Sequence, residues 1–309
     1  MTILAVKTTE AINTALVSDQ GAKFRGLLKK LMPKASDAYS TDNDPYRAHL
    51  GASLLGRKCN RELWYSFHWT TRPNFEGRIL RLFNRGHLEE PRIVALLEMI
   101  DCTVWQADAN GKQFRISGYK GHFGGSLDAV IRGCPDIPDE PILGEFKTHN
   151  DKSFIKLKAE GVLKAKYEHY VQMQMYMAKM ALRWALYIAV NKNDDEIYAE
   201  LIQCKPDEVE RQEKRAVFVI NSVVAPARIN QSPGWHECRF CDHKPVCHGT
   251  AAPDKNCRTC VHIAVLDNGL MGCTNPEKSK SMAPLILSKE EQLAGCAYYV
   301  LNQGMHVSP

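Results

Sequence analysis

The chain has 309 residues, of which 44% are hydrophobic and 24% charged, and its 40 Lys and Arg against 35 Asp and Glu give a formal charge of +5. This composition excludes disordered, collagen-like and coiled-coil proteins, and the length allows one large domain or two smaller ones. The longest apolar runs, such as residues 185–190, are far shorter than the roughly 20 residues of a membrane helix. The first residues also lack the charged start of a secretory signal. We therefore expect a soluble, cytoplasmic protein with no membrane partner.

The spacing of apolar residues predicts a mixture of helices and strands. Apolar positions at intervals of three and four predict helices, whereas short β-rich runs bounded by Gly, Pro and Asp predict strands, the first two of them antiparallel. Pro91 should end or kink the helix that contains it. In chain order we expect helices at 9–34, 50–69 and 77–100, strands at 125–131 and 141–148, helices at 152–164 and 167–181, strands at 184–190 and 196–204, and a helix at 206–224.

The cysteines are unevenly distributed, because seven of the eleven fall between residues 238 and 296. Without a secretory signal, a disulfide framework is not expected. Two C-x2-C pairs, Cys238 with Cys241 and Cys257 with Cys260, each point two thiolates at one centre. Such a centre needs further ligands to complete tetrahedral zinc or a cubane iron-sulfur cluster. The isolated cysteines are interpreted as core or surface residues: Cys102, Cys134 and Cys204.

A charged pair lies in the apolar strand predicted at 141–148. Glu145 and Lys147 are two residues apart, so they share one face of the strand while Phe146 points to the core. Asp128 lies upstream in a second apolar strand, where an unpaired charge is costly. If the strands are neighbours, Asp128 and Glu145 converge on one divalent cation, and oxygen ligands favour Mg2+ or Mn2+. Lys147 would hold a hydroxide or offset phosphate charge; taken singly, each residue fits a surface ion pair equally well.

Two helices carry polar pairs. His87 and Glu90 are three residues apart, and Gln172 and Tyr176 are four apart, so each pair lies on one helix face. A helical histidine or glutamate alone is weak evidence for a site. The methionines around Gln172 are most simply core packing.

Taken in order, these residues resemble the PD-(D/E)xK nuclease superfamily in its RecB-like branch. The motifs that carry the resemblance are Gly86-His87, Gly125-Ser126-Leu127-Asp128, Glu145-Phe146-Lys147, and Gln172 with Tyr176. The run from Arg85 to Pro91 is also similar to the first motif of lambda-type phage exonucleases, in which the glutamate matters. The resemblance implies an α/β fold with the αβββαβ restriction-endonuclease-like core. It also implies a catalytic set of His87, Glu90, Asp128, Glu145, Lys147, Gln172 and Tyr176, with Mg2+ or Mn2+ held by His87, Asp128, Glu145 and Phe146.

The cysteine pattern extends this resemblance. An early Cys59 and the late Cys238, Cys241 and Cys247 are similar to the iron-sulfur staple of CRISPR-associated RecB-like exonucleases, which implies a 4Fe-4S cluster. Asn60 stands where that family commonly has proline. A local zinc site is the alternative, with Cys257 joining the three late cysteines and Cys59 left free.

The tail beyond the nuclease motifs has its own set of cysteines. Cys257, Cys260, Cys273 and Cys296 have the count for a structural Zn2+ site, and His262 or His306 could replace one of them. A segment this short cannot build much core, so a metal would help it to fold. We therefore expect three regions: an N-terminal helix and linker at 1–48, a nuclease domain at 49–250, and a zinc-binding tail at 251–309.

The resemblance implies a metal-dependent DNA exonuclease, acting on single-stranded DNA or free ends in recombination, replication or DNA processing in a phage or prokaryotic host cell. Gln172 and Tyr176 would contact phosphates, and the lysines between 147 and 166 would guide the DNA backbone. Recombination or replication proteins are candidate partners, and an oligomer is compatible with the sequence. Two alternatives stay open: a structure-specific or site-specific endonuclease, and a catalytically silent DNA-binding or redox-sensing module.

Overall fold

The computed structural model describes residues 2–40 and 46–305. By its internal contacts the chain divides into two compact units, each made of several segments. The larger unit comprises Met1–Asn43, Phe75–Ile116 and Gly125–Val209. The smaller unit comprises Asp44–Asn74, Ser117–Gly124 and Glu210–Pro309. No helix among the described residues is long and apolar enough to cross a membrane.

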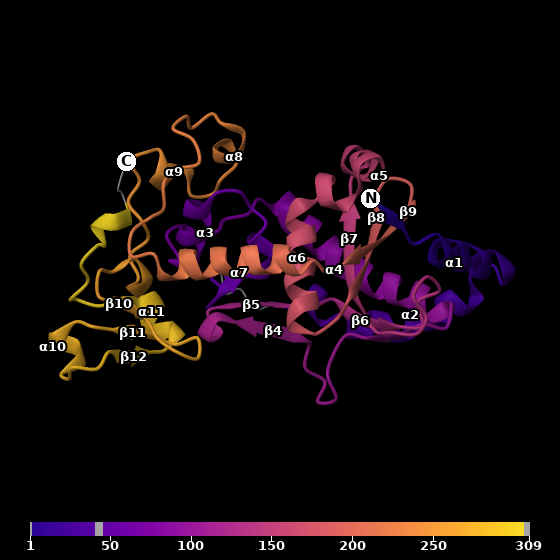
Figure 1. The fold of residues 1–309 in the computed structure, drawn as a ribbon, viewed down its shortest axis with the longest axis horizontal. Coiled ribbons are helices and arrows are strands. Elements are labelled where there is room, and N and C mark those ends of the chain that lie inside the picture. Colours follow the sequence, from indigo (N-terminus) through magenta and orange to yellow (C-terminus); the bar gives the residue numbers. More distant parts are fainter. Residues whose placement is uncertain (1, 41–45, 306–309) are drawn as a thin grey trace. The chain divides into compact units, whose positions relative to one another are not determined.

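The larger unit is built on a six-stranded mixed sheet (Figure 1). Its strand order is β1-β9-β8-β7-β6-β3. The central strands β7 and β8 are parallel, and the other neighbouring strands of this sheet pair in antiparallel fashion. The strands are β1 (Ile3–Leu4), β3 (Thr103–Trp105), β6 (Ala129–Arg132), β7 (Ile142–His149), β8 (Trp184–Asn191) and β9 (Ile197–Gln203).

Helices cover both faces of this sheet. Phe146 packs with Ile93 and Val94 of α4 in the main apolar cluster, whereas α6 contacts β7, β8 and β9. Because neighbouring residues of a strand point to opposite faces, Glu145 and Lys147 lie on the face away from that cluster. The helices of this unit are α1 (Val6–Ser18), α2 (Ala22–Leu31), α4 (Gly77–Met99), α5 (Asp151–Ala165) and α6 (Tyr167–Lys179), and α7 (Pro206–Asn221) begins in it.

The smaller unit is held together by short elements and by a buried arginine. Arg258, which is 1% exposed, donates to the carbonyl oxygens of Phe67 and Ala48, and its guanidinium lies 4.0 Å from the ring centre of Trp69. This arginine therefore ties the tail to the segment around residues 48–69. The elements of this unit include β2 (Leu50–Gly51), α3 (Asn60–Phe67), α8 (His236–Arg239), α9 (Lys244–Cys247), β10 (Ile263–Val265), β11 (Met271–Cys273), α10 (Pro276–Ser279), β12 (Leu285–Leu287) and α11 (Lys289–Ala294).

The observed elements confirm most of the sequence predictions and correct four. The region predicted as one helix at 9–34 forms two helices, α1 and α2. The region predicted as one helix at 50–69 forms β2, a 3-10 turn and then α3. The predicted strand at 125–131 is broken at Asp128 into β5 (Phe123–Ser126) and β6, because the Asp128 carboxylate accepts the Phe146 N–H that a strand carbonyl would otherwise take. Helix α4 also continues through Pro91. Its C-terminal half is buried, which offsets the hydrogen bond that proline removes.

Candidate active site

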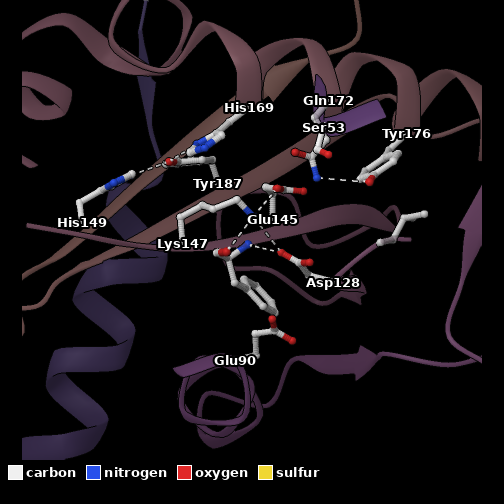
Figure 2. Close-up of polar contacts among 12 residues, drawn as sticks. Ser53, Glu90, Asp128, Glu145, Lys147, His149, His169, Gln172, Tyr176 and Tyr187 are labelled. Carbon is white, nitrogen blue, oxygen red and sulfur yellow. Dashed lines mark hydrogen bonds and ion pairs between the residues drawn. The ribbon is translucent and has the colours of Figure 1, made fainter. Parts of the chain in front are cut away.

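The strand β7 and the bend before β6 bring the predicted acidic pair together. Residues Ala129 and Gly144 are paired in the antiparallel register of β6 and β7, which places Asp128 beside Glu145. The Phe146 N–H donates to Asp128 Oδ2 over 2.8 Å, so the carboxylate of Asp128 is fixed by the strand backbone. Figure 2 shows Asp128, Glu145 and Lys147 pointing toward one another.

The Lys147 ammonium lies among three oxygens. Its Nζ is 2.5 Å from Glu145 Oε1, 3.4 Å from Asp128 Oδ2 and 3.0 Å from the carbonyl oxygen of Phe146. These oxygens belong to three of the four residues expected to bind a divalent cation. The lysine therefore places a positive charge at the point where those oxygens meet.

Glu145 is the most unusual group of the site. Its side chain is fully buried, and neither carboxylate oxygen has a hydrogen-bond partner among the described residues; the ion pair with Lys147 is close but lacks hydrogen-bond geometry. Burial raises the pKa of Glu145, the Lys147 ammonium opposes this, and the charges of Asp128 and Glu90 add to the rise. Glu145 and Lys147 therefore form one buried ion pair, and the ionised form of Glu145 depends on the Lys147 ammonium for its stabilisation.

Helix α4 supplies the second wall of the site. His87 Nδ1 lies 3.7 Å from Glu90 Oε1, and both side chains are partly exposed. The two residues line one cavity with Phe146 and Lys147. The structure therefore brings the polar pair of α4 to the same cavity as the residues of β7.

Helix α6 places Gln172 and Tyr176 above the acidic pair. Gln172 Nε2 donates to the Tyr176 hydroxyl over 3.2 Å, and Tyr176 is only 2% exposed. Burial raises the pKa of Tyr176, and the charges of Glu145 and Asp128 raise it further. Gly125 makes room for this tyrosine, because a Cβ there would lie 2.5 Å from the Tyr176 hydroxyl.

A buried polar chain next to the site was missed by the sequence analysis. His149 Nε2 lies 2.8 Å and His169 Nδ1 2.9 Å from the Tyr187 hydroxyl (Figure 2). Burial lowers the pKa of His149 to about 3 and that of His169 well below its ordinary value, and the Lys147 charge contributes to both. Both rings are therefore neutral. A signal was present, since His149 follows Lys147 by two residues and His169 precedes Gln172 by three.

In the smaller unit, Cys59 lies with three late cysteines. Cys59, Cys238, Cys241 and Cys247 line one cavity, together with Arg61, Arg228 and Lys244. Burial raises the pKa of the Cys241 thiol to about 12. This grouping is the one that the resemblance implies, and Cys257 of the alternative local site lies elsewhere.

The remaining tail cysteines line a second cavity. Its lining includes Cys257, Cys260, Cys273 and Cys296, with His262 beside them; His306 lies outside the described residues. Across residues 2–40 and 46–305, however, no group of three or more His, Cys, Asp or Glu side chains is arranged to hold a metal ion as it stands. The iron-sulfur and zinc sites therefore stay predictions. The isolated Cys102 and Cys134 are buried in the core, and Cys204 is half-buried.

Comparisons with known proteins give only distant likenesses. No protein-family model matches the chain, and no curated protein matches it. The crystal structure of SSO0001 is similar with a TM-score of 0.41 and 16% identity, over 72% of this chain and 97% of that one. The alkaline exonuclease LHK-Exo from Laribacter hongkongensis is similar with a TM-score of 0.40 and 16% identity, over 56% of this chain and 86% of that one. Its complex with dAMP gives a TM-score of 0.40 and 14% identity, over 62% and 90%.

Proposed function

We propose that this chain is a divalent-metal-dependent deoxyribonuclease that hydrolyses phosphodiester bonds from DNA ends. The observation that carries the proposal is the position of the Lys147 ammonium, within 3.4 Å of oxygens of Glu145, Asp128 and Phe146. A positive charge already lies where two carboxylates and a carbonyl meet. Oxygen donors of this kind are those that Mg2+ and Mn2+ prefer.

The donor set fits a divalent ion. A fully buried carboxylate without hydrogen bonds, such as that of Glu145, is costly to maintain. A cation held by Asp128, Glu145 and the Phe146 carbonyl would offset this cost, with His87 and Glu90 on the facing wall. When bound, Mg2+ or Mn2+ supplies an acidified water and offsets charge on the phosphate.

Lys147 acts as a cation rather than as a base in this arrangement. Burial alone would lower its pKa, but the charges of Asp128 and Glu145 raise the pKa of Lys147 above its ordinary value. The ammonium therefore keeps its proton at neutral pH and can orient a water or offset phosphate charge. On the side of the acidic pair that faces α6, Gln172 donates a hydrogen bond to the Tyr176 hydroxyl.

The DNA backbone would be guided by helix α5. This helix presents exposed lysines close in sequence to the site: Lys152, Lys156, Lys158 and Lys164. Contacts between lysines and phosphates release counterions, so binding should weaken as salt rises. A role in recombination, replication or DNA processing, with partner proteins of those processes, follows from the resemblance and belongs to the same proposal.

For the smaller unit, the proposal includes two metal centres. The four cysteines in the lining of the cavity with Cys59 would hold a 4Fe-4S cluster, as the resemblance to the iron-sulfur staple implies. The four cysteines in the lining of the tail cavity give the ligand count of a tetrahedral structural zinc site. Both would be structural, because hydrolysis requires no electron transfer.

The function is tested with end-labelled single-stranded, linear duplex and closed circular DNA, each with Mg2+ or with a chelator. Wild type should release nucleotides from linear DNA with Mg2+ alone, and Glu145→Gln should release none. Glu196→Gln is the matched control, because Glu196 pairs with Lys158 in an exposed ion pair. Cleavage of closed circles would instead establish an endonuclease, and binding without cleavage by wild type would establish a silent DNA-binding module.

A further inference from the structure

One wall of the active-site cavity carries an aromatic side chain that the proposed chemistry does not use. The cavity measures about 400 Å3 and is lined by residues of α4, the end of β7 and Lys192. This volume lies in the range of small-molecule sites, which is roughly 300–1,000 Å3. Phe83, His87 and Glu90 all line it, and their spacing of four and three residues places them along one face of α4.

Phe83 is presented to solvent and also held in place. Its exposed fraction is 45%, although the ring belongs to the cavity lining. Phe75, itself 43% exposed, packs edge to face against it, with ring centres 5.1 Å apart and planes at 84°. An exposed aromatic pair of this kind is not part of the core. Because the two rings are nearly perpendicular, Phe75 covers at most one face of Phe83 and leaves at least one face for a flat partner.

Cations and carboxylates both line this cavity. Lys147 and Lys192 lie with Glu89 and Glu90 in its lining, and Arg85 donates to the Lys192 carbonyl oxygen over 2.9 Å. A ligand that satisfies these groups together has a phosphate for the cations and a flat apolar ring for Phe83. A nucleotide with an unstacked base has both, and bases stack on aromatic side chains without sequence preference.

We infer that Phe83 is a base-stacking platform for the nucleotide next to the bond that is cut, which makes an unpaired strand end the substrate class. This inference rests on the proposed nuclease function and specifies its substrate. The base of a paired nucleotide is stacked within the duplex and cannot lie on Phe83, so a duplex end must fray before it enters. Phe75 acts as a positioning residue that fixes the Phe83 ring.

The test compares wild type with Phe83→Ala, Phe83→Tyr and Leu80→Ala. Leu80 is an exposed apolar residue of the same helix that is not among the cavity-lining residues, so its loss controls for surface and helix effects. Each protein binds oligonucleotides that end either in 2-aminopurine, whose fluorescence falls on stacking, or in an abasic nucleotide. Binding is measured with Ca2+ in place of Mg2+, and cleavage of the same oligonucleotides is then measured with Mg2+.

We expect Phe83→Ala to weaken binding of the base-bearing end on the order of 10-fold, to abolish quenching, and to leave binding of the abasic end unchanged. Phe83→Tyr and Leu80→Ala should behave as wild type. Equal affinity of wild type for base-bearing and abasic ends would overturn the inference, as would equal losses on both in Phe83→Ala. A change from dimer to monomer in Phe83→Ala with unchanged quenching would also overturn it, because the ring would then cover a second copy of the chain.

The two readouts separate this inference from the proposed function. If wild type cleaves no DNA with Mg2+ but quenches 2-aminopurine through Phe83, the nuclease assignment fails and the stacking platform stands. If wild type cleaves base-bearing and abasic ends at equal rates without quenching, the nuclease stands and the platform fails.

Discussion

The carboxylate site of the larger unit and the cysteine cavities of the smaller unit are built by different means. Glu145 and Lys147 lie in β7, which is paired with β8 from Leu143 to His149 and with β6 from Ile142 to Gly144. Cys238 and Cys247 lie in helices of four residues, α8 and α9, and Cys59 precedes α3. A paired strand holds its side chains without any ligand, whereas short helices and turns bury too little surface to do so.

The two regions also differ in how their charge is balanced. Lys147 neutralises Glu145 within the protein, so the carboxylate site can exist before a metal binds. Cys59, Cys238 and Cys241 are thiols in the metal-free chain, since burial raises the pKa of each. Metal binding to these cysteines must release protons, and its free energy must supply much of the stabilisation that orders the cavity. Removal of metal should therefore disturb the smaller unit and leave the larger unit folded.

Replacement of Lys147 should give the largest effect. Lys147→Ala removes the cation that balances Glu145 and should lower the rate of nucleotide release on the order of 10²–10³-fold. It should also destabilise the fold, because a buried carboxylate then has no opposite charge, at a cost of roughly 3–5 kcal/mol. Single-turnover cleavage and thermal unfolding measure the two effects.

A second variant separates chemistry from folding in this experiment. Glu145→Gln combined with Lys147→Met leaves no buried charge at the pair, so it should recover most of the lost stability and none of the activity. Lys23→Gln, which breaks an exposed pair with Asp101, should change neither. Recovery of activity in the double variant would show that neither Glu145 nor Lys147 is needed for cleavage.

Replacement of Cys59 tests the other region. Cys59→Ala should release iron, bleach absorption near ~400 nm that cysteine-ligated clusters show, and lower the unfolding temperature by about 5–10 °C. Cys204→Ser, a half-buried cysteine of the larger unit, should leave iron content unchanged. Full iron content in anaerobically prepared Cys59→Ala would contradict the four-cysteine grouping and favour the local alternative.

The pH dependence of stability distinguishes the regions further. Burial raises the pKa of Glu145 from 4.5 to about 7, so the folded metal-free protein holds this proton more tightly than the unfolded chain does. The stabilisation that the folded state gains from protonated Glu145 is fully present below pH 4.5 and is lost as the pH rises toward about 7. As the pH rises from 5 to 8, the unfolding temperature of metal-free wild type should therefore fall relative to that of Glu145→Gln.

Added Mg2+ should reverse that loss. Protons compete with the metal for Glu145 below a pH of about 7, so Mg2+ should stabilise wild type more at pH 8 than at pH 5. Glu145→Gln should show little of this difference. An unfolding temperature of metal-free wild type that runs parallel to that of Glu145→Gln across this range would show that Glu145 is ionised throughout.

The sequence predicted the elements of the larger unit well because most of them are long and periodic. Strand alternation alone placed Glu145 and Lys147 on one face, and the register of β6 with β7 confirms that Asp128 lies beside them. Two of the local features that were predicted wrongly depend on tertiary contacts. The break of the strand at Asp128 depends on a hydrogen bond from the distant Phe146, and the continuity of α4 through Pro91 depends on burial of that helix.

Contacts between distant residues explain what the sequence analysis missed. The chain from His149 through Tyr187 to His169 joins β7, β8 and α6, and none of the three residues belongs to a local motif. The stacking of Phe75 on Phe83 likewise brings together a loop residue and a residue of α4. A single sequence shows periodicity within each element but does not show which side chains of different elements meet.

The smallest expected effect concerns the glycine beneath Tyr176. In Gly125→Ala, the new Cβ would lie 2.5 Å from the Tyr176 hydroxyl and 2.8 Å from Cε1, so the ring must move and its contact with Gln172 must loosen. We expect the rate of cleavage to fall about 10-fold through this misplacement, without loss of metal affinity. Gly26→Ala in α2 is the matched control, because Gly26 is not among the cavity-lining residues and nothing lies within 4 Å of the added Cβ. Combining Gly125→Ala with Tyr176→Phe should restore part of the rate, since the closest atom is gone; a double variant slower than both single variants would place the effect in the backbone instead.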